Sequence, residues 1–179
     1  MTALWTEAEL TRALGAPSAK LAAPVGGVSI DTRTLAPGDL FFAIKGEASD
    51  GHDYLARAFE AGAAAAVIAK SRGAGLAAHE PTFAVDDTLA AMERLGRAAR
   101  ARAKARVVAV TGSVGKTSAK EMLRVALGRF GPTRASAASY NNHWGVPLTL
   151  SRLPAGAAVR LRAGGPAGRG SHPAGRLRP

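Results

Sequence analysis

The segment from residue 107 to residue 128 constrains the fold of this chain more than any other. It begins with the run VVAV, continues through a glycine-containing turn at residues 111–116, and then shows helical spacing up to Gly128. A strand, a glycine loop and a helix in this order are typical of a phosphate-binding loop in an α/β domain. The apolar positions, spaced as on one helix face, are Ala119, Met122, Leu123, Ala126 and Leu127.

The turn carries groups suited to the phosphates of a nucleotide. It reads TGSVGKT from Thr111 to Thr117. Its glycines let backbone N–H groups converge on phosphate oxygens, and the helix that begins here adds the positive end of its dipole. We expect Lys116 to be the catalytic residue, reaching the β- and γ-phosphates, and the Thr117 hydroxyl to bind Mg²⁺. The predicted ATP-binding residues are Thr111, Gly112, Ser113, Val114, Gly115, Lys116, Thr117 and Ser118.

The loop is shorter than the general phosphate-loop pattern. That pattern has a further glycine where this chain has Val110. An alternative interpretation is a glycine turn between strand and helix that contains a lysine by chance. The strand before the turn and the amphipathic helix after it favour phosphate binding.

Residues 1–86 predict a small α/β domain. Thr6 can cap a helix that includes Glu9 and ends at Gly15. Short apolar runs at residues 25–30, 40–44, 65–69 and 82–85 are typical of strands, and residues 53–62 have helical spacing. We expect this domain to fold without the rest of the chain.

Residues 87–154 predict the start of a second, central ATP-binding domain. Asp87 or Thr88 can cap a helix that buries one apolar face and turns basic residues toward water or an anion. The residues expected in the core are Leu89, Met92, Leu95 and Ala99. The basic residues expected on the surface are Arg94, Arg97, Arg100, Arg102 and Lys104.

Composition narrows the classes of protein that this chain can belong to. The absence of cysteine excludes disulfides, thiolate metal ligands and a cysteine nucleophile. The sequence has no apolar stretch long enough to cross a bilayer. We therefore expect a cytoplasmic protein with no membrane insertion, and a monomer.

The formal net charge of +11 raises nucleic acid as a partner. Much of the excess lies in residues 155–179, which hold five arginines and no acidic residue. The chain has no recognised nucleic-acid motif and few aromatic residues to interleave with its basic ones. We expect no nucleic-acid partner, and we keep a basic, nucleotide-regulated nucleic-acid-binding module as the alternative function.

Three motifs, in order along residues 1–154, resemble the Mur ligases, which extend the peptide of the UDP-linked cell-wall precursor. The first is SIDTRTLAPGDLFFAIKGEASDGHDYLARAFEAGAAAAVI at residues 29–68, similar to the UDP-substrate-binding domain of that family. The second is the loop TGSVGKT. The third is YNNHWGVPLTLSRL at residues 140–153, similar to the members that add D-alanyl-D-alanine.

The resemblance implies a reaction and a set of binding residues. ATP would activate the carboxylate of UDP-N-acetylmuramoyl-tripeptide to an acyl phosphate, which the amine of D-alanyl-D-alanine would attack. Carried over by position, the uridine diphosphate site would hold Asp31, Thr32 and Arg33, with the supporting loop Gly46, Asp50, Gly51 and His52. Asn141 and Asn142 would contact substrate or phosphate.

Structural alternatives remain open for each of these groups. Asp31 and Arg33 can pair with each other, and Asp50-Gly51 can be only a turn. The two asparagines can cap the following helix and fix its turn. For His143 and Trp144, which follow them, a packing role is the simpler expectation.

Residues 155–179 depart from the family pattern. Twenty of these 25 residues are Ala, Gly, Pro or Arg, and no Asp or Glu follows Glu121. We expect disorder here and no second metal ligand, so that the chain is inactive alone. The lack of an acidic residue after the loop helix also weakens a third interpretation, in which the chain is another phosphate-loop kinase or ATPase.

A reading-frame shift near Ala155 in a GC-rich gene would account for this composition, because such codons encode Ala, Gly, Pro and Arg. We predict that another frame of the DNA encodes a ligase-like continuation. Translating the two remaining frames tests the hypothesis, which fails if neither of them resembles the family.

Overall fold

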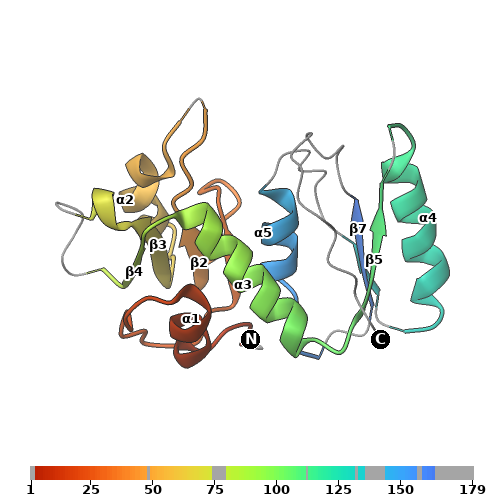
Figure 1. The fold of residues 1–179 in the computed structure, drawn as a ribbon, viewed down its shortest axis with the longest axis horizontal. Helices are drawn as coiled ribbons and strands as arrows, with labels where there is room; N and C mark the ends of the chain where they lie inside the picture. Colours follow the sequence, from red (N-terminus) through yellow and green to blue (C-terminus); the bar gives the residue numbers. More distant parts are fainter. Residues whose placement is uncertain are drawn as a thin grey trace.

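The chain forms two parallel sheets, one in each half, in the computed structural model shown in Figure 1. The first sheet has the order β1-β2-β3-β4, and the second has the order β5-β7-β6. The predicted α/β class is therefore confirmed. The structure describes residues 3–47, 49–73, 80–111, 113–131, 133–135, 144–156 and 159–163.

Short elements alternate along the first half. The strands are β1 (Gly27–Ser29), β2 (Asp39–Phe42), β3 (Ala65–Ala69) and β4 (Thr82–Val85). The helices are α1 (Glu7–Leu14), the 3₁₀ turns η1 (Gly51–Tyr54) and η2 (Lys70–Arg72), α2 (Leu55–Glu60) and α3 (Thr88–Arg102). The second half contains β5 (Arg106–Val110), α4 (Lys116–Gly128), β6 (Thr133–Ala135), α5 (Gly145–Ser151) and β7 (Val159–Ala163).

Local signals in the sequence explain where several of these elements begin and end. Thr6 and Glu9 form the predicted capping box, and Gly15 follows the last turn of α1. Asp87 caps α3 by accepting hydrogen bonds from the backbone N–H groups of Leu89 and Ala90 at 2.7 and 2.9 Å. β3 and β4 have the bounds that the apolar runs predict.

The first sheet is the middle layer of three. Leu40 and Phe42 of β2 face a core formed with α1, α3 and α5, whereas Phe41 and Ala43 face a smaller cluster with α2. Side chains alternate between the faces of a strand, so a continuous apolar run is what a strand covered on both faces requires.

The larger core draws on residues far beyond position 86. Met92 and Leu95 of α3, Leu148 of α5 and Leu153 beyond it are fully buried in it. The expectation that residues 1–86 fold alone does not fit this packing, because α3 and α5 cover one face of their sheet. The boundary at residue 86 stays a prediction.

The second sheet corrects the expectation of disorder after residue 154. β7 lies in the middle of this sheet and pairs in parallel with β5 and with β6. Its sequence, VRLRA, alternates apolar and basic residues, which is the period of a strand. The expected disorder is therefore wrong for residues 159–163, and residues 164–179 lie outside the described part of the chain.

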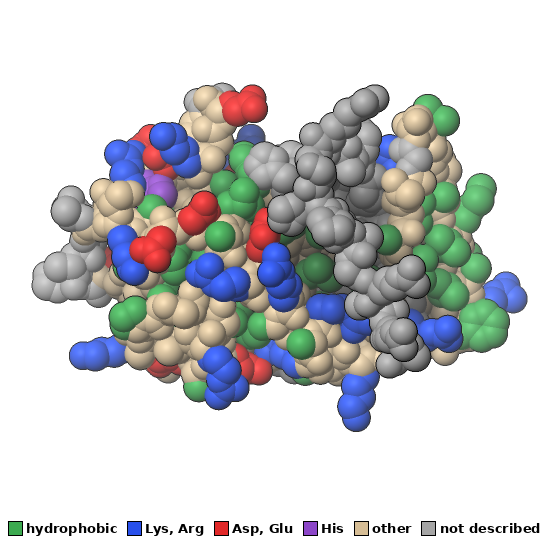
Figure 2. Space-filling view, in the orientation of Figure 1, with side chains coloured by type: hydrophobic (Ala, Val, Ile, Leu, Met, Phe, Trp, Pro, Cys, Tyr) green, Lys and Arg blue, Asp and Glu red, His purple; other side chains and the backbone are tan. Residues whose placement is uncertain are grey.

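The helix after the phosphate loop is less buried than its pattern predicts. Ala119, Leu123 and Leu127 are half-buried, but Met122 is 71% exposed. Ala126 is exposed as well. Figure 2 shows apolar side chains over α4 on the surface. Among the described residues of β5, α4 and β6, none belongs to the buried apolar core.

The basic residues of α3 make contacts within the chain. Arg94 donates to the carbonyl of Leu14 at 2.8 Å, and Arg97 pairs with Glu93 at 3.4 Å. The expectation that Arg102 faces water is wrong, since its guanidinium lies 3.4 Å from the centre of the Trp5 ring. This use of the arginines does not favour a nucleic-acid interface. Among the described residues, no helix is long and apolar enough to span a membrane.

We predict that Leu148→Ala destabilises the body built on the first sheet, although Leu148 comes from the second half of the sequence. Removing this fully buried side chain should lower the free energy of unfolding by about 2–5 kcal/mol, because a cavity remains in the core. Urea unfolding followed by tryptophan fluorescence measures the change. Met122→Ala, at an exposed position, is the control and should stay within about 0.5 kcal/mol of wild type. Equal losses in both variants would contradict the shared core.

Candidate functional site

The phosphate loop lies between the carboxyl end of β5 and the amino end of α4. Gly115 has φ +76°, a conformation that a residue with a side chain rarely adopts, and it directly precedes the helix. Among the described residues, no side chain caps the first N–H groups of α4. These N–H groups can therefore be satisfied by a phosphate.

The side chains of the loop have the placement that phosphate binding needs. Ser113, Val114, Thr117 and Ser118 are exposed, as is Thr111 at the end of the strand. The Lys116 ammonium donates to the carbonyl of Ser113 at 3.4 Å, which holds this side chain across the loop. Of the predicted residues, Gly112 lies outside the described part.

A magnesium ion would find one ligand in this loop. The Thr117 hydroxyl is exposed in the first turn of α4, beside the position proposed for phosphate. Among the described residues, there is no group of three His, Cys, Asp or Glu side chains that could hold a metal by themselves. The residues present therefore fit Mg²⁺ only as an ion that phosphate oxygens also bind.

A second site lies beyond the carboxyl ends of β1 and β2. It is a pocket of about 440 Å³ in the first half of the chain. In an open parallel sheet, this end of the strands is where ligands bind. The pocket is lined by Ile30, Asp31, Thr32, Arg33, Phe41, Ile44, Gly46, Ser49, Gly51, Tyr54, Arg57 and Trp144.

The three residues predicted at the uridine diphosphate site, residues 31–33, all line this pocket. Asp31 and Arg33 form the pair that the sequence left open, with Nη2 to Oδ2 at 2.6 Å and Nε to Oδ1 at 2.9 Å. The hydrogen bonds from Arg33 keep the pKa of the Asp31 carboxyl below its usual value, with partial burial acting in the opposite direction. The pair leaves the Nη1 group of Arg33 for a ligand.

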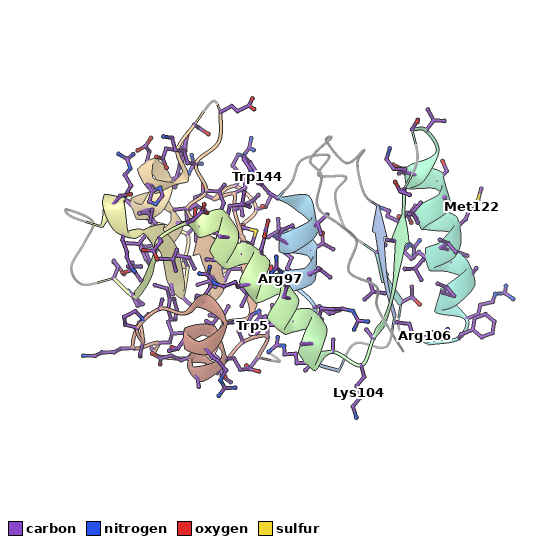
Figure 3. The ribbon with its side chains drawn as sticks, viewed as in Figure 1. Trp5, Arg97, Lys104, Arg106, Met122 and Trp144 are labelled. Atoms are coloured by element: carbon purple, nitrogen blue, oxygen red, sulfur yellow. The ribbon has the colours of Figure 1, made fainter. Side chains whose placement is uncertain are left out.

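Seven of the lining residues were not predicted as binding residues, and three of these, Tyr54, Arg57 and Trp144, carry side chains suited to a nucleotide. Tyr54 and Arg57 stand one helical turn apart, and the tyrosine is 43% exposed. Trp144 comes from the start of α5, where Figure 3 labels it. Spacing could have suggested the first two, but nothing local to Trp144 shows which sheet α5 joins.

The supporting loop divides between the pocket and the interior. Gly46 and Gly51 line the pocket, whereas Asp50 and His52 do not, and His52 is only 6% exposed. A Cβ at Gly51 would lie 2.6 Å from the backbone nitrogen of Ile44, so this close approach requires glycine. The expectation that His52 contacts substrate is therefore corrected by its burial. Asn141 and Asn142 lie outside the described residues.

We predict that Arg33→Gln raises the pKa of Asp31 toward its ordinary value of about 3.9, because a neutral amide replaces the paired cation. The wild-type pKa is lowered on folding, so this contribution to stability is present above about pH 3.9 and is lost as the pH falls through the folded-state value. In the variant, the free energy of unfolding should therefore fall less steeply as the pH is lowered through this range.

A ¹³C NMR titration of the carboxyl groups measures the shift. Asp50 serves as an internal control, because its pKa is lowered by His52 and Arg72, against the effect of its burial. An Asp31 titration that is identical in both proteins would show that the pair does not persist in solution.

Comparisons with known proteins bear on both sites. The family model "Mur ligase family, catalytic domain" matches residues 24–100, and "Mur ligase middle domain" matches residues 110–160. The second match continues past Ala155. The first model covers every residue that lines the pocket except Trp144. The second model covers the phosphate loop and Trp144.

Individual relatives agree with these matches. The UDP-N-acetylmuramoyl-tripeptide–D-alanyl-D-alanine ligase of Synechocystis sp. is 41% identical over 129 residues, which are 72% of this chain and 28% of the relative. A UDP-N-acetylmuramoylalanyl-D-glutamyl-2,6-diaminopimelate–D-alanyl-D-alanyl ligase structure from Acinetobacter baumannii has a TM-score of 0.78 at 30% identity, covering 93% of this chain and 37% of that one.

A MurF ligase from Thermotoga maritima in complex with ADP has a TM-score of 0.59 at 26% identity, covering 76% of this chain and 31% of that one. The chain thus spans between 28% and 37% of the length of these three proteins. Because two models of one family match in order along the sequence and named members align across most of it, the chain belongs to the Mur ligase family.

Proposed function

We propose that this chain supplies two substrate sites of an ATP-dependent ligase that adds D-alanyl-D-alanine to UDP-N-acetylmuramoyl-tripeptide in peptidoglycan precursor synthesis. The observation that carries the proposal is the pocket of about 440 Å³, which is lined by two arginines and three aromatic residues. A UDP-linked substrate presents a diphosphate and a planar base. Guanidinium donors and aromatic faces bind these groups.

The pocket residues have distinct roles in this proposal. Arg33, held in place by Asp31, and Arg57 from α2 would bind the diphosphate. Tyr54 and Trp144 would contact the uracil ring or the sugar. Because the Asp31–Arg33 pair fixes one guanidinium before the ligand arrives, less side-chain entropy is lost on binding.

The proposed reaction has two steps. The terminal carboxylate of the tripeptide attacks the γ-phosphorus of ATP, and ADP leaves. The amine of D-alanyl-D-alanine then attacks the carbonyl carbon of the acyl phosphate, which releases phosphate and forms the amide bond. The names of the relatives, and the ADP in one of them, support this choice of substrates.

The phosphate loop would serve the first step. Lys116 and the N–H groups at the start of α4 would hold the phosphates and stabilise the charge that develops on them. Mg²⁺, when bound, would neutralise phosphate charge, with Thr117 as its ligand from this chain. No Asp or Glu follows Glu121, so we expect this chain alone to form no ligated product.

We propose that it acts as a cytoplasmic monomer.

We predict that Lys116→Ala weakens ATP binding by about tenfold or more, because the variant loses a charged contact to the β- and γ-phosphates. Isothermal titration calorimetry with ATP and Mg²⁺ measures the affinity. UDP binding by the same variant is the control and should be unchanged, since the pocket does not include the loop. Equal ATP affinity in both proteins would reject the assignment of the loop.

We predict that Arg57→Ala weakens UDP binding by about tenfold, through loss of one charged hydrogen-bond donor to the diphosphate. Titrations with UDP and with uridine separate the contributions, because uridine lacks the diphosphate and should lose little affinity. Arg97→Ala is a matched control on α3, since Arg97 does not line the pocket. If the wild-type chain binds neither UDP nor UDP-N-acetylmuramoyl-tripeptide, the proposed function is wrong.

A further inference from the structure

His52 lies behind the pocket and joins two segments of the first half. Its Nδ1 is 2.6 Å from Oδ1 of Asp50, and its Nε2 accepts a hydrogen bond from the backbone N–H of Ala69 at 2.9 Å. A backbone N–H can only donate, so Nε2 must carry no proton. The ring is therefore neutral, with its proton on Nδ1, where it can be donated to the carboxylate of Asp50.

The carboxylate of Asp50 extends this network. Its Oδ1 also accepts from the backbone N–H of His52 at 3.0 Å, and its Oδ2 accepts from Nη2 of Arg72 at 3.0 Å. The side chain of Asp50 is mostly buried, and that of His52 more so. Each polar atom of the His52 ring thus has a defined partner, which fixes the ring plane and the tautomer.

The same segment forms one wall of the pocket on its other side. Backbone hydrogen bonds close it into a tight loop, from Gly46 to the carbonyl of Ser49 at 2.8 Å and from Gly51 to the carbonyl of Ile44 at 2.9 Å. Gly46, Ser49, Gly51 and Tyr54 all line the pocket. A buried contact at residues 50–52 therefore controls where the wall lies.

We propose that His52 is a positioning residue: its neutral Nδ1–H tautomer ties the loop at residues 45–52 to the end of β3 and thereby sets the affinity of the pocket for a nucleoside diphosphate. Among the described residues of this loop, no other side chain forms a hydrogen bond to β3, whose last residue is Ala69. The inference rests on the proposed function only in the identity of the ligand.

Two variants test separately the hydrogen bond of His52 to Asp50 and its hydrogen bond to Ala69. His52→Gln retains an acceptor that can reach the N–H of Ala69 but loses the Nδ1–H group. His52→Asn retains a donor near Asp50 but is too short to reach Ala69. We expect each to weaken UDP binding by about tenfold, since each leaves one side of the link broken, and to leave ATP binding unchanged.

Ligand-free measurements test the anchoring by itself. In the ¹⁵N NMR spectrum of the imidazole ring, wild-type His52 should show a protonated Nδ1 and an unprotonated Nε2. Amide hydrogen exchange at Gly46 and Gly51 should be faster in both variants, because their hydrogen bonds lie in the released loop. Leu10→Ala, a core variant on α1, controls for a general loss of stability and should leave UDP affinity unchanged.

The outcomes distinguish this proposal from the proposed function. A protonated Nε2 in wild type, or UDP affinity within twofold of wild type in both folded variants, overturns the positioning role. If wild type binds no UDP, the proposed function fails, and hydrogen exchange then decides whether His52 anchors the loop. Exchange rates at Gly46 and Gly51 that are the same in wild type and in both His52 variants overturn the anchoring.

Discussion

Packing of α5 against α3 and the first sheet is the contact on which the rest of this structure depends. α5 follows the phosphate-loop segment in the sequence, yet its Leu148 and Thr149 are buried with the first half. Gly96 of α3 permits this approach, since a Cβ there would lie 3.1 Å from the carbonyl oxygen of Pro147. One helix thus joins the body that holds the pocket to the segment that holds the second sheet.

Polar contacts give this packing its register. The indole N–H of Trp5 donates to the carbonyl of Ser151 at 2.9 Å, and Nε of Arg152 donates to the carbonyl of Val28 at 2.6 Å. Arg102 stacks on Trp5 and donates to Glu9 at 2.8 Å, which joins α1 to α3. The first two contacts fix the carboxyl end of α5, and Trp144 at the opposite end of the helix forms part of the pocket.

The sequence predicted most elements that have local signals. The Thr6 cap, the bounds of β3 and β4, and the strand, loop and helix around Lys116 all follow from residues within one or two turns of each other. β7 was missed because arginines alternate with its apolar residues in a segment whose composition is typical of disorder. Tertiary pairing with β5 and β6 outweighs that composition.

The candidate site was predicted less completely than the fold, for a physical reason. Motifs located residues 31–33 and the phosphate loop, because their chemistry is contained in a few consecutive residues. The direction in which a side chain points within a loop depends on contacts with remote segments. His52 turns inward because the N–H of Ala69, 17 residues later, needs an acceptor, and Trp144 reaches the pocket only through the packing of α5. Neither contact has a local signature.

The two halves differ in how their stability arises, and this difference links nucleotide binding to folding. The first sheet is covered on both faces. In the second half, Met122 and Val125 of α4 are 71% and 61% exposed, and Phe130, just after the helix, is 87% exposed. Local opening should therefore cost less free energy in the second sheet. A nucleotide held by the N–H groups of α4 and by Lys116 binds only when β5, the loop and the helix are assembled. By linkage, it stabilises that half more than the first, by an amount that grows with the logarithm of its concentration above Kd.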